Sequence, residues 1–200
     1  MDLFSLNNYS NLLPCNGRVI YHGKVMSNEE ALYYFNQLNN TIEWKNDEVI
    51  IFGKLIKTSR KVAWYASSNI EYTYSNISKK AEPFTPELLS LKQIVEQKTG
   101  EKYNACLLNL YQNGNEGMGW HSDDEKMLEP LASIASLSFG ADRKFSLKHQ
   151  QNNQTVSVKL ENGSLLEMKD KTQLFWKHSL PKTTKVIGPR INLTFRKMVV

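Results

Sequence analysis

The sequence predicts an α+β protein that is mainly β, built as a sandwich, a barrel or a jelly roll. From Tyr103 onward, short β-branched and aromatic runs alternate with turn residues, and little of this half suits a helix. The first half instead contains two segments with helical apolar spacing and capping residues. With 200 residues, 40% of them hydrophobic, the chain is long enough for one domain with a sizeable core.

The N-terminal part predicts one strand and one helix. Residues 19–21 favour a short strand that follows an irregular arm. Ser27 and Glu30 form a capping box, in which the serine caps the helix and the glutamate reaches back to it. Apolar residues continue at helical spacing, and we expect the helix to end at 39–40.

The next segments predict a strand, a loop and a second helix. The β-branched run 48–54 favours a strand that enters a tight turn, and 58–61 favours a basic loop. Thr85 is a suitable helix cap, Pro86 fits the first turn, and Gly100 ends the helix.

The second half predicts a series of short strands joined by turns. Asn152–Asn153 and Asn162–Gly163 are typical of hairpin connections. No internal repeat, low-complexity tract or domain linker is visible. The change near residue 100 from helical patterns to short strand patterns therefore lies within one compact unit. The strands are expected near residues 103–111, 132–139, 143–149, 154–160, 164–168, 172–177 and 190–197.

Composition indicates where the protein is located and what kind of partner it binds, but it does not indicate an activity. The net charge of +5 suits a polyanionic partner, although mildly basic proteins are common. Cys15 and Cys106 lack metal-ligand spacing, and no apolar stretch is long enough to span a membrane. The N-terminus has no secretory signal pattern. We therefore expect a cytoplasmic protein, or a nuclear one if its source is eukaryotic.

The stretch from Asn109 to Asp124 contains the first candidate site. His121 and Asp123 are two residues apart, so they point to the same side of an extended chain. With His178 as a third ligand they form a two-histidine, one-carboxylate triad, the usual setting for non-haem Fe(II). Taken alone, each histidine is more often an ordinary surface or core residue, and the His-x-Asp spacing is common.

The last predicted strand supplies the second candidate site. Arg190, Asn192, Thr194 and Arg196 share one face of it, and apolar residues occupy the other. One interpretation is an edge strand with a solvated charged face. The other is a pocket for a small dicarboxylate, because arginine grips carboxylates in a bidentate fork. Asn109 and Tyr111 share a face of their own strand and complete that pocket.

Taken together, these motifs resemble the AlkB family of Fe(II)/2-oxoglutarate-dependent dioxygenases. The resemblance runs from about Phe52 to Lys197 and is strongest to the animal nuclear branch that repairs duplex DNA. Residues 1–45 match weakly, and the partner-binding N-terminal tail of that branch has no evident counterpart here. The motifs that carry the resemblance are Asn109-x-Tyr111, His121-x-Asp123, His178 and Arg190-x-Asn192-x-Thr194-Phe195-Arg196.

The resemblance implies a fold and a set of cofactors. The fold is a double-stranded β-helix, or jelly roll, with supporting N-terminal helices and a nucleotide-recognition lid. Residues 1–200 then form a single dioxygenase domain, with the extension and lid in about 1–100 and the catalytic core in about 101–200. His121, Asp123 and His178 are the implied Fe(II) ligands. The residues implied to hold 2-oxoglutarate are Asn109, Tyr111, Arg190, Asn192 and Arg196.

The resemblance also implies a reaction, with two alternatives. Fe(II), O2 and 2-oxoglutarate oxidise a methyl group on a base nitrogen in DNA, releasing formaldehyde, succinate and CO2. Suitable lesions are 1-methyladenine and 3-methylcytosine. One alternative is an RNA demethylase of the same family, and the other is a non-catalytic jelly-roll module that binds nucleic acid. The intact triad argues against the second alternative.

The implied substrate residues lie mostly in the first half. Phe52, Gly53 and Lys54 resemble a finger that inserts an aromatic wedge into duplex DNA and offsets the cost of flipping a base. Arg60 keeps its family offset from Phe52 and is a candidate for contacting a phosphate or filling the gap. A core position is the plain alternative for Phe52.

Three further residues are implied to read the flipped base. Tyr72 and Tyr74 resemble the lid, and Asp124 would accept a hydrogen bond from an exocyclic amino group. The plain alternatives are packing for the tyrosines and a solvated loop for Asp124. The expected partner is DNA, as a duplex with base flipping, with single-stranded DNA or RNA as alternatives. We expect a monomer without membrane association.

Overall fold

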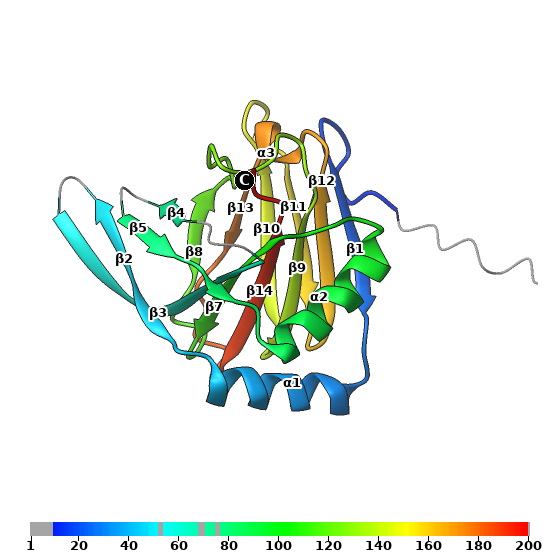
Figure 1. The fold of residues 1–200 in the computed structure, drawn as a ribbon. Helices are drawn as coiled ribbons and strands as arrows, with labels where there is room; N and C mark the ends of the chain where they lie inside the picture. The colour runs from blue at the N-terminus through cyan, green and yellow to red at the C-terminus, as the bar shows by residue number, and fades with distance from the viewer. Residues whose placement is uncertain (1–9, 52–53, 68–70, 75–76, 200) are drawn as a thin grey trace, which may run out of the picture.

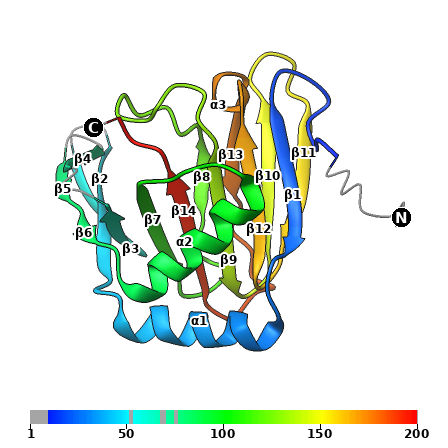
Figure 2. The same cartoon turned by 45° about the vertical axis from the view of Figure 1, so that its right-hand side comes forward.

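Two β-sheets stacked face to face form the body of the protein, and two helices cover the outer side of the larger sheet (Figures 1 and 2). The computed structural model describes residues 10–51, 54–67, 71–74 and 77–199. The helices are α1 (Asn28–Thr41), α2 (Pro86–Thr99) and the short α3 (Thr172–Phe175). No helix within these ranges is long and apolar enough to cross a membrane.

The larger sheet combines strands from both halves of the chain. It contains eight strands among the described residues, and the short β6 (Glu82–Pro83) pairs with β3 outside the main path. Along that path the order is β1 (Arg18–Lys24), β12 (Ser164–Lys169), β9 (Ile134–Gly140), β14 (Arg190–Arg196), β7 (Ala105–Tyr111), β3 (Lys54–Ala66) and β2 (Lys45–Ile51).

The smaller sheet has four strands, in the order β11 (Thr155–Leu160), β10 (Arg143–His149), β13 (Trp176–Leu180) and β8 (Met118–His121). A separate ribbon consists of β4 (Glu71–Tyr74) and β5 (Ile77–Lys80). Two opposed, mainly antiparallel sheets are the architecture of a jelly roll, so the predicted fold class is confirmed.

Apolar side chains fill the spaces on both faces of the larger sheet. Between the sheets, Leu147 and Trp176 of the smaller sheet pack with Leu166 of the larger one, and all three are fully buried. On the outer side, Leu91 of α2 packs with Leu193 of β14. Fully burying each leucine contributes about 2 kcal/mol. The two apolar layers therefore hold the sheet between the helices and the smaller sheet.

Both long helices begin where the sequence predicts, α2 also ends there, and α1 ends at Thr41, one residue beyond the predicted end. The Ser27 hydroxyl accepts the backbone N–H of Glu30, and the Glu30 carboxylate accepts that of Ser27, so the capping box is confirmed. Thr85 caps α2, and Gly100 ends it in the left-handed conformation at φ 75°. These contacts are local, which explains why the sequence is sufficient to predict them.

β14 lies in the centre of the larger sheet, with β9 on one side and β7 on the other. Every residue from Arg190 to Arg196 is buried. Ile191, Leu193 and Phe195 face the helices, and the polar residues between them face the smaller sheet. The edge-strand interpretation is therefore wrong, and the alternation of polar and apolar faces is confirmed.

Two predicted loops have a different structure. Residues 58–61 are not a loop but lie inside β3, which pairs with β2 on one side and with β7 on the other. Asn162–Gly163 is not a hairpin, because it connects β11 of the smaller sheet to β12 of the larger one. Both errors concern long-range strand pairing, and turn residues alone do not specify which strands they join.

The predicted strand at 172–177 is wrong in its first part. Residues 172–175 form α3, and β13 begins only at Trp176. The Thr172 hydroxyl donates to the Lys169 carbonyl at 2.6 Å and accepts the Arg18 N–H at 2.9 Å. This contact with β1, more than 150 residues away in sequence, fixes a turn that the local β pattern does not reveal.

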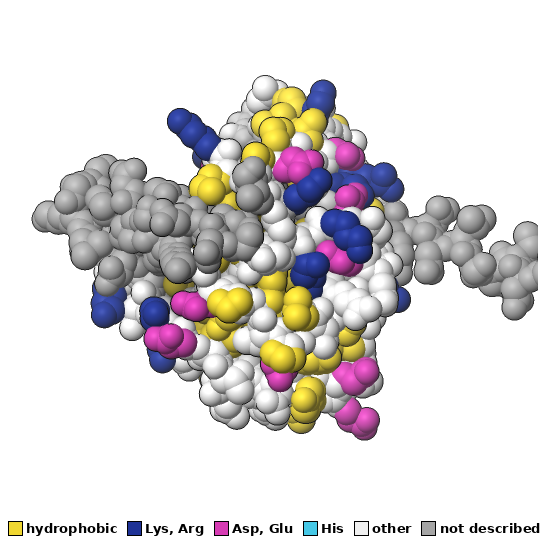
Figure 3. All heavy atoms as spheres, in the orientation of Figure 1, with side chains coloured by type: hydrophobic (Ala, Val, Ile, Leu, Met, Phe, Trp, Pro, Cys, Tyr) yellow, Lys and Arg dark blue, Asp and Glu magenta, His cyan; other side chains and the backbone are white. Residues whose placement is uncertain are grey.

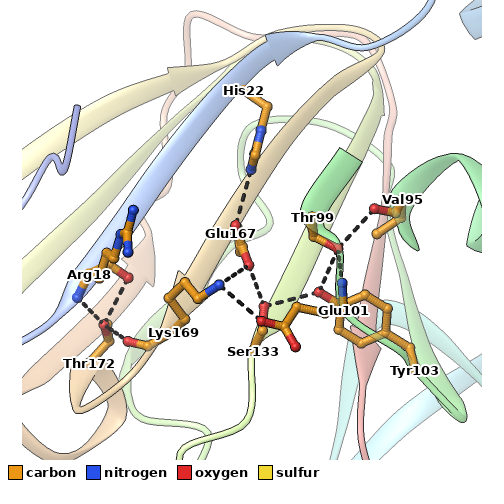
Figure 4. Close-up of polar contacts among 10 residues, drawn as sticks. All are labelled: Arg18, His22, Val95, Thr99, Glu101, Tyr103, Ser133, Glu167, Lys169 and Thr172. Atoms are coloured by element: carbon orange, nitrogen blue, oxygen red, sulfur yellow. Dashed lines mark hydrogen bonds and ion pairs between the residues drawn. The ribbon is translucent and has the colours of Figure 1, made fainter. Parts of the chain in front are cut away.

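A buried polar cluster joins β1 and β12 to the chain before β9 (Figure 4). Glu167, 1% exposed, accepts a hydrogen bond from Ser133 at 2.8 Å. It also pairs with His22 and with Lys169, both at 3.2 Å. Burial raises the pKa of Glu167, but these partners outweigh it and hold the pKa below its ordinary value of 4.5. The charged carboxylate therefore stabilises the fold.

Replacement of Glu167 by glutamine is expected to cost about 2 kcal/mol of unfolding free energy at pH 7, because the charge-assisted contacts are lost. Since the folded pKa of Glu167 is lowered, its contribution is complete above pH 4.5 and disappears as the pH falls through the folded pKa. Urea unfolding at several pH values measures this. The gap between wild type and Glu167→Gln should shrink in acid, and Glu82→Gln, at an exposed carboxylate, should show no gap. A gap that is constant with pH would contradict the prediction.

Candidate metal centre and co-substrate pocket

The two histidines of the predicted triad face each other across a pair of strands. β8 ends at His121, and its Cα partner in β13 is His178. The ring centroids are 4.2 Å apart. Both rings point into the space between the sheets, where they line a pocket. The sequence did not predict β8 as a separate strand, but its extended form is what brings His121 into register with His178.

Asp123 completes the group just beyond the end of β8. Its Oδ1 lies 3.8 Å from Nε2 of His121 and 3.9 Å from Nε2 of His178. Two atoms that bind the same ion at about 2.1 Å can be at most about 4.2 Å apart, when they lie on opposite sides of it. Both distances are below this limit, so one ion can bind the carboxylate together with either imidazole. The three ligand atoms lie within 4.8 Å of one another. Among the described residues the structure thus brings all three predicted ligands together.

The hydrogen bonds of the histidines suit metal binding. Nδ1 of His121 donates to the Gly119 carbonyl at 2.9 Å, which leaves Nε2 as the lone-pair nitrogen on the side of Asp123. Burial lowers the pKa of His178 to about 4, so its ring is neutral at pH 7. Two imidazoles and a carboxylate form the donor set that non-haem Fe(II) prefers, and these residues therefore fit the ion.

Two contacts hold Asp123 in place. Arg196 donates to Oδ1 at 3.0 Å, and the Asp123 backbone N–H donates to Oε1 of Gln173 at 2.9 Å. Burial raises the pKa of Asp123, but Arg196 and the two histidines outweigh it, so the carboxyl stays ionised. Gln173 lies in α3, and its role was not predicted because the local pattern of that segment favours a strand.

Arg190 provides a buried cation on the opposite wall. It is 2% exposed and donates to Ser138 at 2.9 Å and to Asn192 at 2.6 Å. Burial lowers the pKa of Arg190 to about 10, so the guanidinium remains charged at pH 7. Its Nε has no hydrogen-bond partner in the part of the chain that the structure describes. A buried donor of this kind indicates an acceptor supplied by a ligand.

Asn109 and Tyr111 of β7 lie directly beside this arginine. The register pairs Asn109 with Asn192 and Tyr111 with Arg190. The Arg190 guanidinium carbon lies 5.7 Å from the centre of the Tyr111 ring, within cation–π range. Oδ1 of Asn109 is buried and has no partner among the described residues. Four of the five predicted co-substrate residues therefore meet in one polar corner that suits a carboxylate, whereas Arg196 pairs with Asp123 and Glu125.

The pocket that contains both groups has a volume of about 1290 Å³. Binding sites for one small ligand usually occupy about 300–1,000 Å³, so there is room for a dicarboxylate and a second molecule. Asp124 is exposed and lines this pocket beside the triad. Its position is compatible with both the predicted contact to a base and a solvated loop.

The structure describes the remaining predicted substrate residues to different extents. Phe52 and Gly53 lie outside the described residues. Lys54 begins β3, and Tyr72 and Tyr74 lie in β4, but the side chains of all three lie outside the described structure.

Arg60 is described in full and is 6% exposed. It forms an ion pair with the buried carboxylate of Asp47 and donates to the Met118 sulfur at 3.0 Å. In this structure Arg60 is part of the pocket wall.

The glycines before β8 allow two loops to pack closely. A Cβ on Gly114 would lie 2.2 Å from the Thr183 carbonyl oxygen, and one on Gly117 would lie 2.4 Å from that of Leu180. Gly114 also exchanges backbone hydrogen bonds with Thr183 and Val186, all at 2.8 Å. These glycines therefore join the loop before His121 to the loop after His178.

Arg143 strengthens the same junction, and sequence reasoning missed it. It is 2% exposed and donates to the carbonyls of Asn113 at 3.3 Å, Glu116 at 2.8 Å and Pro181 at 3.0 Å. It also lies 5.8 Å from the centre of the Tyr111 ring. One signal was available, because Arg143 occupies the inward, apolar face of its strand with Phe145 and Leu147.

The substitution Arg143→Lys is expected to lower the unfolding free energy by about 2–4 kcal/mol, because an ammonium cannot reproduce the guanidinium fork that binds three carbonyls. Mn(II) binding by the folded variant should also weaken, since both ligand strands end at this junction. Urea unfolding and calorimetric titration measure the two effects. Arg18→Lys, at an exposed arginine, is the matched control, and equal effects in both variants would contradict the role of Arg143.

Comparisons with known proteins agree with this geometry. The family model described as the 2OG-Fe(II) oxygenase superfamily matches residues 17–196. DNA oxidative demethylase ALKBH2 of Mus musculus is 36% identical over 198 residues, which cover 94% of this chain and 81% of that protein. Alpha-ketoglutarate-dependent dioxygenase alkB homolog 3 of Bos taurus is 39% identical over 178 residues, which cover 84% of this chain and 62% of that protein.

A solved structure, titled "The structure of OsALKBH1", is similar with a TM-score of 0.64. The match covers 92% of this chain and 99% of that one, and the 15% sequence identity supports the fold alone. Because the family model spans most of the chain and the ALKBH2 relative is covered over most of its length, the chain belongs to the 2OG-Fe(II) oxygenase superfamily and, within it, to the AlkB family.

Proposed function

We propose that this protein is a dioxygenase that removes methyl groups from N-alkylated bases in DNA, such as 1-methyladenine and 3-methylcytosine. Fe(II), O2 and 2-oxoglutarate supply the oxidation of the methyl carbon. The hydroxymethyl product then releases formaldehyde, and 2-oxoglutarate leaves as succinate and CO2. The relatives named DNA oxidative demethylase support this choice of substrate and reaction.

The observation that carries the proposal is the arrangement of His121, Asp123 and His178 in the same pocket as Arg190. Each group alone has an ordinary structural explanation. Together they combine a metal donor set with a buried cation that has an unsatisfied N–H. This is what an Fe(II) enzyme with an anionic co-substrate requires.

One side of the pocket would bind the iron, and the other would bind 2-oxoglutarate. His121, Asp123 and His178 would hold the iron, and Arg196 keeps the aspartate ionised and oriented. Arg190, Asn109 and Tyr111, supported by Asn192, would hold a carboxylate of 2-oxoglutarate. The protein thus positions the reactants and limits the access of water, while the bound iron provides the oxidation.

The substrate base would enter from the side of Asp124. This carboxylate would accept a hydrogen bond from the exocyclic amino group of adenine or cytosine. Tyr72 and Tyr74 would belong to the lid, and Tyr74 would stack on the flipped base opposite His121, where a positive charge on the lesion favours an aromatic face. Phe52, with Gly53 and Lys54, would act as the wedge in the duplex, and Arg60 would contact the DNA near it.

We further propose that residues 1–200 act as a single dioxygenase domain and that the protein works as a monomer. The extension and lid would occupy about 1–100 and the catalytic core about 101–200. The larger sheet supports one cooperative unit, because β1, β2 and β3 from the first half pair with strands of the second half or with each other. Duplex DNA with base flipping is the proposed substrate form, and the cytoplasm or nucleus is the proposed location.

Anaerobic loading with Fe(II) and 2-oxoglutarate, followed by oxygen, tests the reaction. With oligonucleotides that carry 1-methyladenine or 3-methylcytosine, we expect demethylated DNA and succinate in equal amounts. His121→Ala should abolish both products, because one of three metal ligands is lost. The same variant should lose most of the thermal stabilisation by Mn(II), since a ligand that binds the folded state raises its stability. Failure of the wild type to form both products would falsify the proposal.

The substitution Phe52→Ala is expected to reduce activity on duplex DNA roughly tenfold or more and to spare most of the activity on single strands. The reason is that a wedge offsets an unstacking cost of a few kcal/mol, which single strands largely lack. Initial rates on matched single-stranded, double-stranded and RNA substrates measure this. Equal losses on single and double strands would count against the wedge, and a strong preference of the wild type for RNA would favour the RNA demethylase.

A further inference from the structure

The outer face of the smaller sheet is free of acidic side chains from its own strands. β8, β10, β11 and β13 contain no Asp or Glu, although acidic residues are one tenth of the whole chain. They contain four lysines, which we call the lysine face: Lys144, Lys148, Lys159 and Lys177. By contrast, the face that carries α1 and α2 mixes acidic and basic side chains (Figure 3).

Strand alternation turns these lysines away from the core. Phe145 and Leu147 of β10 are buried between the sheets, so Lys144 and Lys148 point outward. Lys144, Lys159 and Lys177 are exposed, and Lys148 is partly exposed. The side chains between them are small and polar, as shown by Ser146 and Ser157, whose hydroxyls hydrogen-bond at 3.1 Å. The result is a basic surface on the outer side of the smaller sheet.

The register places the lysines as like-charged pairs. Lys144 is the Cα partner of Lys159, and Lys148 is the partner of Lys177. Like charges directly opposite each other destabilise a sheet. Asp142 relieves Lys159 through an ion pair at 2.8 Å, but the other three lysines have no ion-pair partner among the described residues. An external anion would remove this repulsion.

The lysine face continues to the mouth of the catalytic pocket. A second hollow of about 280 Å³ lies on it, lined by Trp120, Lys148 and Lys177 among others. Lys177 and Gln150 line both this hollow and the catalytic pocket. Trp120 directly precedes the metal ligand His121 and is 47% exposed. An exposed tryptophan beside unpaired lysines is the combination that binds nucleic-acid strands, by stacking and by charge.

We propose that the lysine face, with Trp120 at its edge, binds the phosphate backbone of the nucleic acid next to the base in the pocket. Lys148 follows Lys144 by four steps along β10, a distance of about 13 Å at the rise of a strand. One nucleic-acid strand advances about 3.4 Å per phosphate, so the face spans about four phosphates. This inference rests on the proposed function, which identifies the bound polymer as nucleic acid. It adds the position of the nucleic-acid strand on either side of the base in the pocket.

The triple variant Lys144→Gln, Lys148→Gln, Lys177→Gln tests the proposal. Its matched control is Lys24→Gln, Lys98→Gln, Lys102→Gln, which removes the same charge from exposed lysines near the helices and the sheet edge. Binding of an unmodified, fluorescently labelled 20-mer duplex is measured by anisotropy between 50 and 300 mM salt. The lysine-face variant should bind about tenfold more weakly or worse, and its slope of log K against log salt should be smaller by about 2–3. The control should keep the slope of the wild type.

Two further measurements distinguish a loss of binding at the lysine face from misfolding of the variant and from a failure of the proposed function. Demethylation of a 20-mer should suffer far more in the lysine-face variant than demethylation of a methylated trinucleotide, which has too few phosphates to cover the face. Thermal unfolding and Mn(II) binding show that the variant is folded, and single Lys148→Gln and Lys177→Gln variants replace it if it is not. Equal salt slopes in the variant, the control and the wild type would overturn the inference. A wild type that binds DNA but demethylates neither substrate would overturn the proposed function and leave the lysine face standing.

Discussion

The pairing of β8 with β13 is the constraint on which the candidate site depends. It sets the Cα atoms of His121 and His178 opposite each other and leaves Asp123 just beyond the strand end. A slip of one residue would turn either imidazole to the outer face, so only one register forms the site. Arg143 and the close approach at Gly114 hold that register through the loops at the strand ends. The protein thus positions the ligand atoms by backbone pairing, before any ion contributes.

Buried arginines define the other half of the pocket. Burying a charge costs several kcal/mol, and the protein offsets this cost by hydrogen bonds to Ser138 and Asn192 for Arg190 and by the ion pair with Asp123 for Arg196. The compensation is incomplete at Arg190, whose Nε lacks a partner among the described residues, and at Asn109. Both groups line the catalytic pocket, and buried polar atoms without a partner in a pocket wall indicate that a ligand supplies the missing hydrogen bonds.

Strand alternation gives each sheet two faces with different tasks. On β14, Leu193 packs against the helices and contributes to stability, while its neighbour Asn192 lines the pocket. On β10, Leu147 lies between the sheets, and Lys148 points to solvent. The same period of two residues therefore supplies the core, the catalytic pocket and the lysine face. It also explains why the pocket opens beside a basic surface, since the pocket wall that carries His121 and His178 and the lysine face lie on opposite sides of the same four-stranded sheet.

The sequence by itself determined the features that depend on neighbouring residues. The caps at Ser27 and Thr85, the alternation on the last strand and the His-x-Asp spacing are local, and the motifs that follow from them indicated the family. Only the tertiary structure decided which strands pair. The helical turn at Thr172, the position of β14 in the centre of its sheet, the role of Arg143 and the opposed lysines all depend on contacts between residues far apart in sequence. Short-range patterns carry no information about register, and it is register that brings these residues together.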